Sequence, residues 1–381
     1  MARHLVEEKY RSNKANFIFG EEWTSTYVGT GPFRLDRWNP GVGLTARANP
    51  DWVLGPPKLE ALDIRFIPDP RAQLANFLSG EVDLINSPGV EPTDVSTAPE
   101  YWDVRQAAVK SWTRNIRYLE FQFREVPNWQ PAVTDVRVRR ALAQAINRAG
   151  LIEVVNQGLG TMADAFIAPT DPLFSEVERS ITKYPYDPNR AAAALAEAGW
   201  RPVVAGGPAV NGSGNGLEID LWATAGGGAE QEASVITDGW RSVGIGSGFT
   251  IIPSARQRDN EYRVSFPAVN ITSRSVTLDD FVFTSASIPT AEVRWQGSNR
   301  GSFHDPEIDR LRLLASTTFA ESDRRQSVVA MHRRMSELLG IMPLFYGVGV
   351  ILTRNNLHGP VGEVAEKSGM AWNIFEWQLS Q

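Results

Sequence analysis

The stretch from Gly29 to Asn86 constrains the fold of this chain more than any other part of the sequence. It begins with a Gly/Pro cluster at residues 29–32, which is typical of a turn. Residues 33–38 then alternate between apolar and polar side chains, the period of a half-buried strand. After a turn at Asn39 to Gly41, residues 44–48 can return beside that strand. The sequence therefore predicts two neighbouring strands at the start of this stretch.

The second half of the stretch reads as strand, helix, strand. Residues 62–67 alternate again, and Asp69 followed by Pro70 is a good helix N-cap with a first helical residue. Gly80 can end that helix in a left-handed conformation, and we predict a short strand at residues 82–85. We expect a βαβ unit here, with a right-handed crossover.

Length and composition exclude several classes of protein. A chain of 381 residues can bury a large core, and its length favours two lobes over one. The net charge of -6 gives no reason to expect a nucleic-acid partner. The absence of cysteine excludes disulfides, thiolate metal sites and cysteine nucleophiles. Residues 1–10 lack the apolar segment of a secretory signal, and no run approaches the ~20 apolar residues of a membrane span.

Short motifs along the chain carry a family resemblance. They are Gly29–Phe33 with Trp38–Gly41, Asn49–Trp52, Phe66–Asp69 with Gly80–Asp83, Asp135–Leu142 with Ala145–Arg148, Tyr186–Pro188 with Ala196–Trp200, Trp240–Ile245 and Asp305–Asp309. Together they resemble the peptide/nickel type of ABC transporter extracellular solute-binding proteins, family 5. Each motif alone is weak, but they follow the family's order over nearly all of residues 24–381.

The resemblance implies a fold and a domain organisation. The expected fold is α/β and periplasmic-binding-protein-like class II, with two discontinuous lobes joined by a hinge. Residues 1–120, including the βαβ stretch 29–86, would belong to the first lobe, 121–343 would form a continuous second lobe, and 344–381 would return to the first. Only 28 residues precede Gly29, fewer than in the family, so we expect an N-terminally truncated member whose first lobe is incomplete.

The resemblance also implies a function. The chain would be the substrate-binding component of an ABC importer and not an enzyme. It would capture a peptide or an oligosaccharide-like solute in the cleft between the lobes, close about the hinge and deliver the solute to membrane permease subunits. It would be a monomer without a cofactor, located in the periplasm or anchored at the cell surface, and it would have no nucleic-acid partner.

A basic amphipathic helix is expected after Thr134, which we interpret as its cap. Its apolar positions follow the helical spacing, and they are Val138, Ala141, Leu142, Ala145 and Ile146. Four arginines lie mostly off this stripe, and we expect them on a solvated face: Arg137, Arg139, Arg140 and Arg148. Residues 201–216, with five glycines and two prolines, read as a flexible insertion before an alternating strand at 217–222.

Catalytic and metal-binding patterns are missing from the sequence. The four histidines, His4, His304, His332 and His358, are not paired at ligand spacing, and we predict no metal site. There is no Gly-x-Ser-x-Gly nucleophile motif either. Two alternatives remain open: a hydrolase or other enzyme on a two-lobed scaffold, and a truncated fragment that binds nothing. A nucleophile and a base within hydrogen-bond reach in the cleft would favour the enzyme.

Candidate ligand-binding residues lie in two second-lobe segments before residue 281. Trp222 alternates with Leu221, so its side chain can point away from the core. The loop 272–280 contains Arg274, Asp279 and Asp280. In peptide-binding relatives an acidic residue of this region pairs with the ligand's α-amino group. The relatives' Asp-Pro-Asp pattern is absent here, and a helix cap is the alternative role for Asp279.

A third candidate segment precedes residue 299. Trp295 offers an apolar face, and it stands between Arg294 and Gln296, which can donate hydrogen bonds. Such a mixture suits a sugar or a peptide ligand. From the family register we expect Trp295 to face the cleft, with packing on the protein surface as the alternative.

Overall fold

The computed structural model describes residues 3–14, 17, 20–86, 90, 94, 107–204, 206–225, 228–275, 283–360 and 371–380. The chain divides into two units. Unit 1 comprises Met1–Trp112 with Gly349–Gln381, and unit 2 comprises Thr113–Val348. Two long strands, β5 (Ala107–Phe121) and β12 (Ile341–Arg354), each run from one unit into the other. The boundaries predicted from the sequence, at 120/121 and 343/344, fall within these same two strands.

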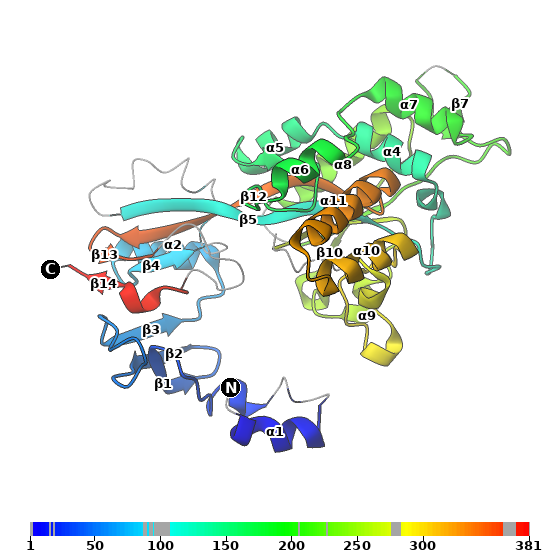
Figure 1. The fold of residues 1–381 in the computed structure, drawn as a ribbon. Coiled ribbons are helices and arrows are strands. Elements are labelled where there is room, and N and C mark those ends of the chain that lie inside the picture. Colours follow the sequence, from blue (N-terminus) through cyan, green and yellow to red (C-terminus); the bar gives the residue numbers. More distant parts are fainter. Residues whose placement is uncertain are drawn as a thin grey trace. The chain divides into compact units, whose positions relative to one another are not determined.

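Unit 1 contains a three-stranded antiparallel sheet, in the order β1-β2-β3 (Figure 1). Its elements are α1 (Arg3–Ser12), the short 3-10 helix Glu21–Trp23, β1 (Phe33–Asn39), β2 (Gly43–Ala48), β3 (Ala61–Arg65), α2 (Pro70–Ser79), β4 (Leu84–Asn86), β13 (Leu357–His358), the 3-10 helix Ile374–Glu376 and β14 (Gln378–Leu379). The pairing of β1 with β2 confirms the two neighbouring strands expected at the start of the central stretch.

Local signals correctly placed both ends of α2. The Asp69 carboxylate accepts a hydrogen bond of 2.8 Å from the Ala72 amide, and Pro70 is the first helical residue. Gly80 ends the helix with φ 86° and ψ 8°, a left-handed conformation that costs glycine little.

The predicted βαβ unit is wrong. The strand before α2 is β3, which pairs with β2 in the three-stranded sheet. The strand after α2 is β4, which pairs antiparallel with β12, with Ile85 opposite Leu352. The two strands therefore belong to different sheets, and no crossover connects them. The partner of β4 lies more than 260 residues away in sequence, where a local pattern gives no information about pairing.

Unit 2 is built on strands in the order β10-β9-β11-β5-β12, with β6 also pairing with β12. Its helices are α4 (Val136–Gln144), α5 (Arg148–Asn156), α6 (Phe174–Ser180), α7 (Pro188–Glu197), α8 (Ala229–Ser242), α9 (Asn260–Arg263), α10 (Pro306–Thr317) and α11 (Glu321–Leu338). Its shorter strands are β6 (Thr161–Met162), β7 (Arg201–Pro202), β8 (Ala209–Val210), β9 (Leu221–Thr224), β10 (Phe249–Ile252) and β11 (Val269–Arg274). The 3-10 helices are Pro131–Thr134, Ser254–Arg256, Ser285–Ser287 and Ala291–Val293.

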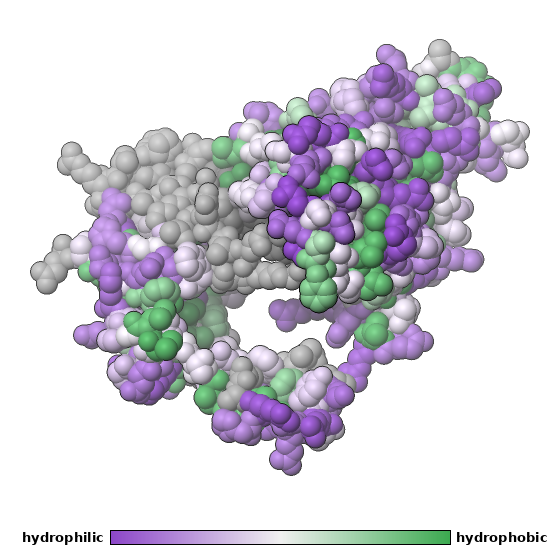
Figure 2. Space-filling model, in the orientation of Figure 1, coloured by the Kyte–Doolittle hydropathy of each residue, from purple (hydrophilic) through white to green (hydrophobic). Residues whose placement is uncertain are grey.

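The core of unit 2 joins one face of these strands to α4, α5, α7 and α8. The strands contribute the fully buried side chains of Leu119, Leu221 and Ile271 to this core. The helices contribute those of Leu142 and Trp240. A second cluster lies around Tyr118, Met331 and Ile341 and includes residues of α10 and α11. On the visible face of the molecule, hydrophilic residues gather over the helices of unit 2 and apolar ones appear as separate groups (Figure 2).

Three local predictions in unit 2 need correction. Asp135 caps α4 by accepting from the Arg137 amide at 2.8 Å, whereas the Thr134 hydroxyl donates to a preceding carbonyl. Residues 201–216 contain the paired strands β7 and β8, so they are not simply a flexible insertion. The strand expected at 217–222 is β9, which spans Leu221–Thr224.

Two of the four arginines expected on a solvated face are buried. Arg139 is 4% exposed and Arg148 is 6% exposed. The Arg139 guanidinium donates to the carbonyls of Val133, Thr134 and Leu338 at 2.6–3.2 Å. It therefore satisfies a carbonyl at the C-terminal end of α11, where backbone acceptors lack helical partners. The charge is buried because several carbonyls replace the water that it loses.

Candidate functional site

The strand arrangement of unit 2 defines where a ligand is most readily bound. Strands β10, β9 and β11 are parallel, so their carboxyl ends meet at one edge of the sheet. Strand β5 runs antiparallel to β11, so its segment from Thr113 to Arg117 lies at that same edge. In open α/β sheets, ligands bind outside the carboxyl ends of the strands.

Alternation along the strands places successive residues on opposite faces of the sheet. On the face of β5 that carries Glu120, Tyr118 belongs to the second hydrophobic cluster and Gln122 is fully buried. Leu119, Leu221 and Ile271 point into the core described above. The residue next to each of them along its strand belongs to the opposite face. There Glu120 of β5 lies opposite Asn270 of β11, and Asn270 lies beside Trp222 of β9. We call Glu120, Asn270 and Trp222 the polar row. It crosses three adjacent strands in register.

Trp222 lies outside the hydrophobic core, in agreement with its place in the alternation. Its side chain is half-buried, and its ring packs on Tyr262 of α9 with centroids 5.0 Å apart. The Arg256 guanidinium lies 3.8 Å from the centre of the Tyr262 ring. Asp259 caps α9 by accepting from the Tyr262 amide at 3.0 Å, which fixes the stack of three side chains over this face.

Glu120 and Asn270 are the buried members of the polar row, at 2% and 3% exposure. The Asn270 amide donates to Glu120 Oε2 at 3.0 Å. Within the described residues, Glu120 Oε1 and Asn270 Oδ1 have no hydrogen-bond partner. The Arg300 backbone N–H also favours the charged carboxylate and acts to lower the Glu120 pKa. One buried oxygen of each side chain thus lacks a hydrogen-bond donor among the described residues, which is an unusual and costly arrangement.

Two arginines act electrostatically on the Glu120 carboxyl. Burial raises the pKa of the Glu120 carboxyl, and the positive charges of Arg300 and Arg263 act in the opposite direction. Burial also lowers the pKa of Arg263, and repulsion from Arg300 adds to that effect. Both arginine side chains are half-buried, and neither donates a side-chain hydrogen bond within the part of the chain that the structure describes.

The carboxyl edge carries a further ion pair. Arg117 of β5 forms a two-pronged contact with Glu232 in the first turn of α8, and one of the two distances is 3.0 Å. Glu232 is 3% exposed. A planar guanidinium opposite a buried carboxylate fixes both groups strongly, so this edge is rigidly connected to α8.

The predicted ligand-binding residues do not form one group. Arg274 is the last residue of β11, opposite Ile116, and is half-buried at the carboxyl edge. It therefore shares its edge with the start of β5 and its face with Trp222. Asp279 and Asp280 lie outside the described residues, so their predicted role stays a prediction.

Arg294, Trp295 and Gln296 lie at the other edge of the sheet. The Trp295 ring packs against the Arg124 guanidinium at 5.3 Å, and Arg124 lies just beyond the C-terminal end of β5. Because β5 is antiparallel to β11, this position is near the start of β11, whereas Arg274 is at its end. The six residues of β11 separate these ends by about 17 Å. Arg294 and Gln296 are exposed.

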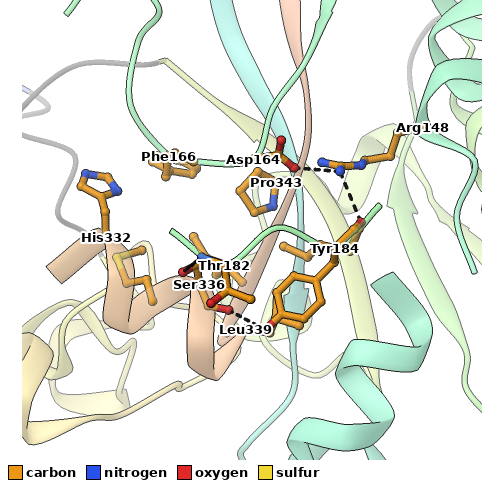
Figure 3. A pocket seen from close by; sticks show the side chains of 13 residues that line it. Arg148, Asp164, Phe166, Thr182, Tyr184, His332, Ser336, Leu339 and Pro343 are labelled. Atoms are coloured by element: carbon orange, nitrogen blue, oxygen red, sulfur yellow. Dashed lines mark hydrogen bonds and ion pairs between the residues drawn. The ribbon is translucent and has the colours of Figure 1, made fainter. Parts of the chain in front are cut away.

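A small cavity in unit 2 is too small for a solute. It has a volume of about 30 Å³ and lies beside α11, where Arg148 donates to Asp164 at 2.8 Å and Tyr184 donates to the Ser336 carbonyl at 3.1 Å (Figure 3). His332 lines the same cavity and is 5% exposed. A volume of this size accommodates one or two water molecules, so we regard the cavity as structural.

Two negative findings concern only the described residues. They contain no group of three or more His, Cys, Asp or Glu side chains placed to hold a metal ion. They also contain no helix long and apolar enough to cross a membrane.

Comparison with known families assigns the chain. Residues 7–285, more than half of its length, match the bacterial extracellular solute-binding proteins, family 5. The chain belongs to this family. The resemblance carried by the sequence motifs is therefore confirmed, and the family is one of solute-binding proteins, not of enzymes.

Relatives of this family-5 protein differ in what their names say they bind. The chain is 25% identical to the dipeptide-binding protein of Escherichia coli over 82% of its own length and 55% of the relative's. It is 29% identical to heme-binding protein A of Haemophilus influenzae over 59% of its length and 38% of the relative's. Among the curated relatives, the matched part spans from 31% to 55% of the relative's own length.

Solved structures confirm the fold of this family-5 protein. NikZ from Campylobacter jejuni in complex with Ni(L-His) superposes with a TM-score of 0.79 at 20% identity, covering 99% of this chain and 72% of that one. An oligopeptide-binding protein from Thermus thermophilus with a pentapeptide gives 0.76 at 23% identity, covering 99% and 71%. The fold is thus α/β and periplasmic-binding-protein-like class II.

Glu120 of the polar row is not among the candidate residues predicted from the sequence. Glu120 stands between Leu119 and Phe121 in a strand rich in apolar residues, and an acidic side chain in such a buried strand is itself a signal. Asn270 carries no comparable local signal, because only the register of β11 on β5 places it opposite Glu120.

Proposed function

We propose that this chain is the solute-binding component of an ABC importer. It captures a small solute, a peptide or an oligosaccharide-like molecule, and delivers it to membrane permease subunits. The observation that carries this proposal is the family match over residues 7–285. The parallel strands β10, β9 and β11 support it, because ligands of open α/β sheets bind outside the carboxyl ends of the strands.

The mechanism that we propose is hinge closure driven by the ligand. Strands β5 and β12 are the chain's two connections between the units, and they would act as the hinge. A ligand shifts an open and closed equilibrium only through contacts that differ between the two states. We further propose that the protein acts as a monomer in the periplasm or at the cell surface, as expected of a transport component.

Native mass spectrometry tests the binding role directly. The chain is purified without denaturation from cells grown in rich medium, and its mass is compared before and after denaturation. We expect a small co-purifying solute that is released on unfolding. Small-angle scattering of the same sample should show a smaller radius of gyration with solute than without it. Release of a chemically converted product during incubation would instead favour an enzyme.

A matched pair of variants locates the site. Trp222→Ala removes a half-buried aromatic side chain of the polar row, and we expect at least tenfold weaker binding of the identified solute, because aromatic anchors carry much of a binding energy. Tyr186→Ala removes an exposed aromatic elsewhere in unit 2 and should leave the affinity unchanged. Equal effects of the two substitutions would contradict the assignment of the polar row.

A further inference from the structure

We propose that residues 347–349 of β12 are the pivot of hinge closure, and that the Asn115 side chain of β5 packs on Gly347 at the start of this pivot. The inference rests on the hinge closure proposed above and assigns it to particular residues. The evidence is that both crossing strands leave their described partners in unit 2 at the same place, where the Asn115 amide lies against Gly347.

Strand β12 is attached to different partners on the two sides of residues 347–349. In unit 2, Tyr346 pairs with β6, and its hydroxyl group lies 2.9 Å from each of two loop carbonyls. In unit 1, residues 351–353 pair with β4, and the Arg354 guanidinium lies 5.0 Å from the centre of the Phe77 ring of α2. Each half of β12 is therefore held by its own unit, and residues 347–349 lie between the two attachments.

Strand β5 leaves its partner in unit 2 beside the same segment. Its described pairing with β11 covers Ile116 to Phe121, so Asn115 is the next residue in the direction of unit 1. Strands β5 and β12 are neighbours in the sheet (Figure 1). A β-carbon on Gly347 would lie 2.3 Å from Asn115 Oδ1, which is closer than two nonbonded atoms approach. Glycine at position 347 is thus what allows the Asn115 side chain to occupy this place.

The composition of the segment suits a pivot. Two of its three residues are glycine, which weakens the interior of a strand. Glycine has the widest range of φ and ψ, so the backbone rotates there at the lowest cost. A hinge is a short run of residues that absorbs a change in φ and ψ between rigid parts. Val348 is the last residue of unit 2, so the boundary between the units falls between the same two glycines.

Single-molecule energy transfer tests the pivot without a ligand. The chain contains no cysteine, so Lys58→Cys in unit 1 and Glu230→Cys in unit 2, both at exposed positions, can carry a donor and an acceptor dye. We expect the dialysed chain to exchange between distances. Gly347→Ala combined with Gly349→Ala should slow this exchange at least about threefold, because alanine narrows the accessible φ and ψ. Gly212→Ala, whose added β-carbon meets no atom within 4 Å, should leave the rate unchanged.

The possible outcomes separate this inference from the mechanism on which it rests. If the parent chain exchanges between distances and the variant with both glycines replaced does so at the same rate, the pivot lies elsewhere and hinge closure still stands. A single fixed distance in the parent chain, both alone and with a casein peptide digest as the probe, would overturn the pivot and hinge closure together.

Urea unfolding of double variants tests the contact between Asn115 and Gly347. Gly347→Ala should lower the midpoint of unfolding, because its β-carbon displaces the Asn115 amide, and adding Asn115→Ala should restore most of that loss. In a Gly349→Ala background, Asn115→Ala should restore nothing. If Gly347→Ala does not fold, Gly349→Ala alone is used for the exchange measurement. Equal effects of Asn115→Ala in the two backgrounds would overturn the role assigned to Asn115.

Discussion

Two tryptophans of unit 2 show what a local pattern can predict. It indicates the sheet face to which a side chain points, but not which residues surround that side chain. Trp222 lies off the core, as its position between Leu221 and Ala223 indicates. Trp295 was interpreted by the same kind of local chemistry, yet its ring packs on Arg124 at the opposite edge of the sheet from Arg274. Local chemistry identifies a side chain that can bind, and the strand register decides where it is.

Substitution of Trp295 distinguishes contact with a ligand from packing on the protein surface. If it contacts ligand, Trp295→Ala should weaken binding of the identified solute about thirtyfold, which corresponds to ~2 kcal/mol for an aromatic anchor. If it only packs on Arg124, the substitution should lower the free energy of unfolding by about 1 kcal/mol through a lost cation–π contact and leave the affinity within twofold. Titration calorimetry and urea unfolding of the same variant distinguish the two results.

His332 should make the stability of unit 2 depend on pH. Burial lowers its pKa to about 4 from 6.5. The other titratable groups lining its cavity are Arg148, Asp164 and Tyr184. Between pH 6.5 and 4 the unfolded chain binds a proton that the folded chain does not, so the free energy of unfolding decreases as the pH falls through this window. At pH 5 this contribution is about 2 kcal/mol.

The measurement is urea unfolding of unit 2 at pH 7 and pH 5. In His332→Gln the difference between the two pH values should be about 2 kcal/mol smaller than in the parent chain. His304→Gln, at a side chain that is 53% exposed, provides the control and should leave the difference unchanged. An identical pH dependence in parent and His332→Gln would show that His332 does not titrate as described.

Whole elements were predicted best where a helix begins with an aspartate followed by a proline. Asp69, Asp187 and Asp305 each accept a hydrogen bond from a backbone amide of the first turn at 2.8–3.1 Å. Each is followed by proline, whose fixed φ angle suits the first helical position. The capping residue and the proline are neighbours in sequence, so this signal for the start of a helix does not depend on which distant segments pack against the helix.

The packing of α4 against α11 provides a prediction at this scale. Arg139→Met should lower the free energy of unfolding by about 3 kcal/mol, because the carbonyls of Val133, Thr134 and Leu338 lose their donor while buried. Arg137→Met, on the exposed side of α4, should cost less than about 1 kcal/mol although Arg137 pairs with Asp135. Comparable losses in urea unfolding would contradict a specific role for Arg139.

At the scale of the molecule, the two sheets differ in how much their strands bury. The buried apolar residues of unit 1 include Phe77, Ile85 and Leu352, which lie on α2, β4 and β12 and not on the three-stranded sheet. In the three-stranded sheet of unit 1, β1 and β3 contain no buried residue, and Gly43 is the buried residue of β2. Strand β11, in contrast, begins with four buried residues in succession.

Hydrogen exchange followed by mass spectrometry should reveal this difference. We expect the amides of β1, β2 and β3 to exchange at least tenfold faster than those of β11 and of β5 from residue 113, because few buried apolar contacts oppose local opening. Addition of the identified solute should slow exchange in unit 2 further. Uniform protection across both sheets would contradict the interpretation that the three-stranded sheet is weakly held.

The sequence by itself determined the family, the α/β class, most helix ends and the face on which Trp222 lies, because caps, turns and alternation are properties of residues a few positions apart. The tertiary structure alone decided which strands pair and which charges are buried. Strand β4 pairs with β12 and not with β3, and Asn270 meets Glu120 across 150 residues of sequence. Arg139 is buried because carbonyls from α11 reach it. Such contacts depend on the free energy of the whole fold, where distant segments replace water as partners, and no local pattern records which segments these are.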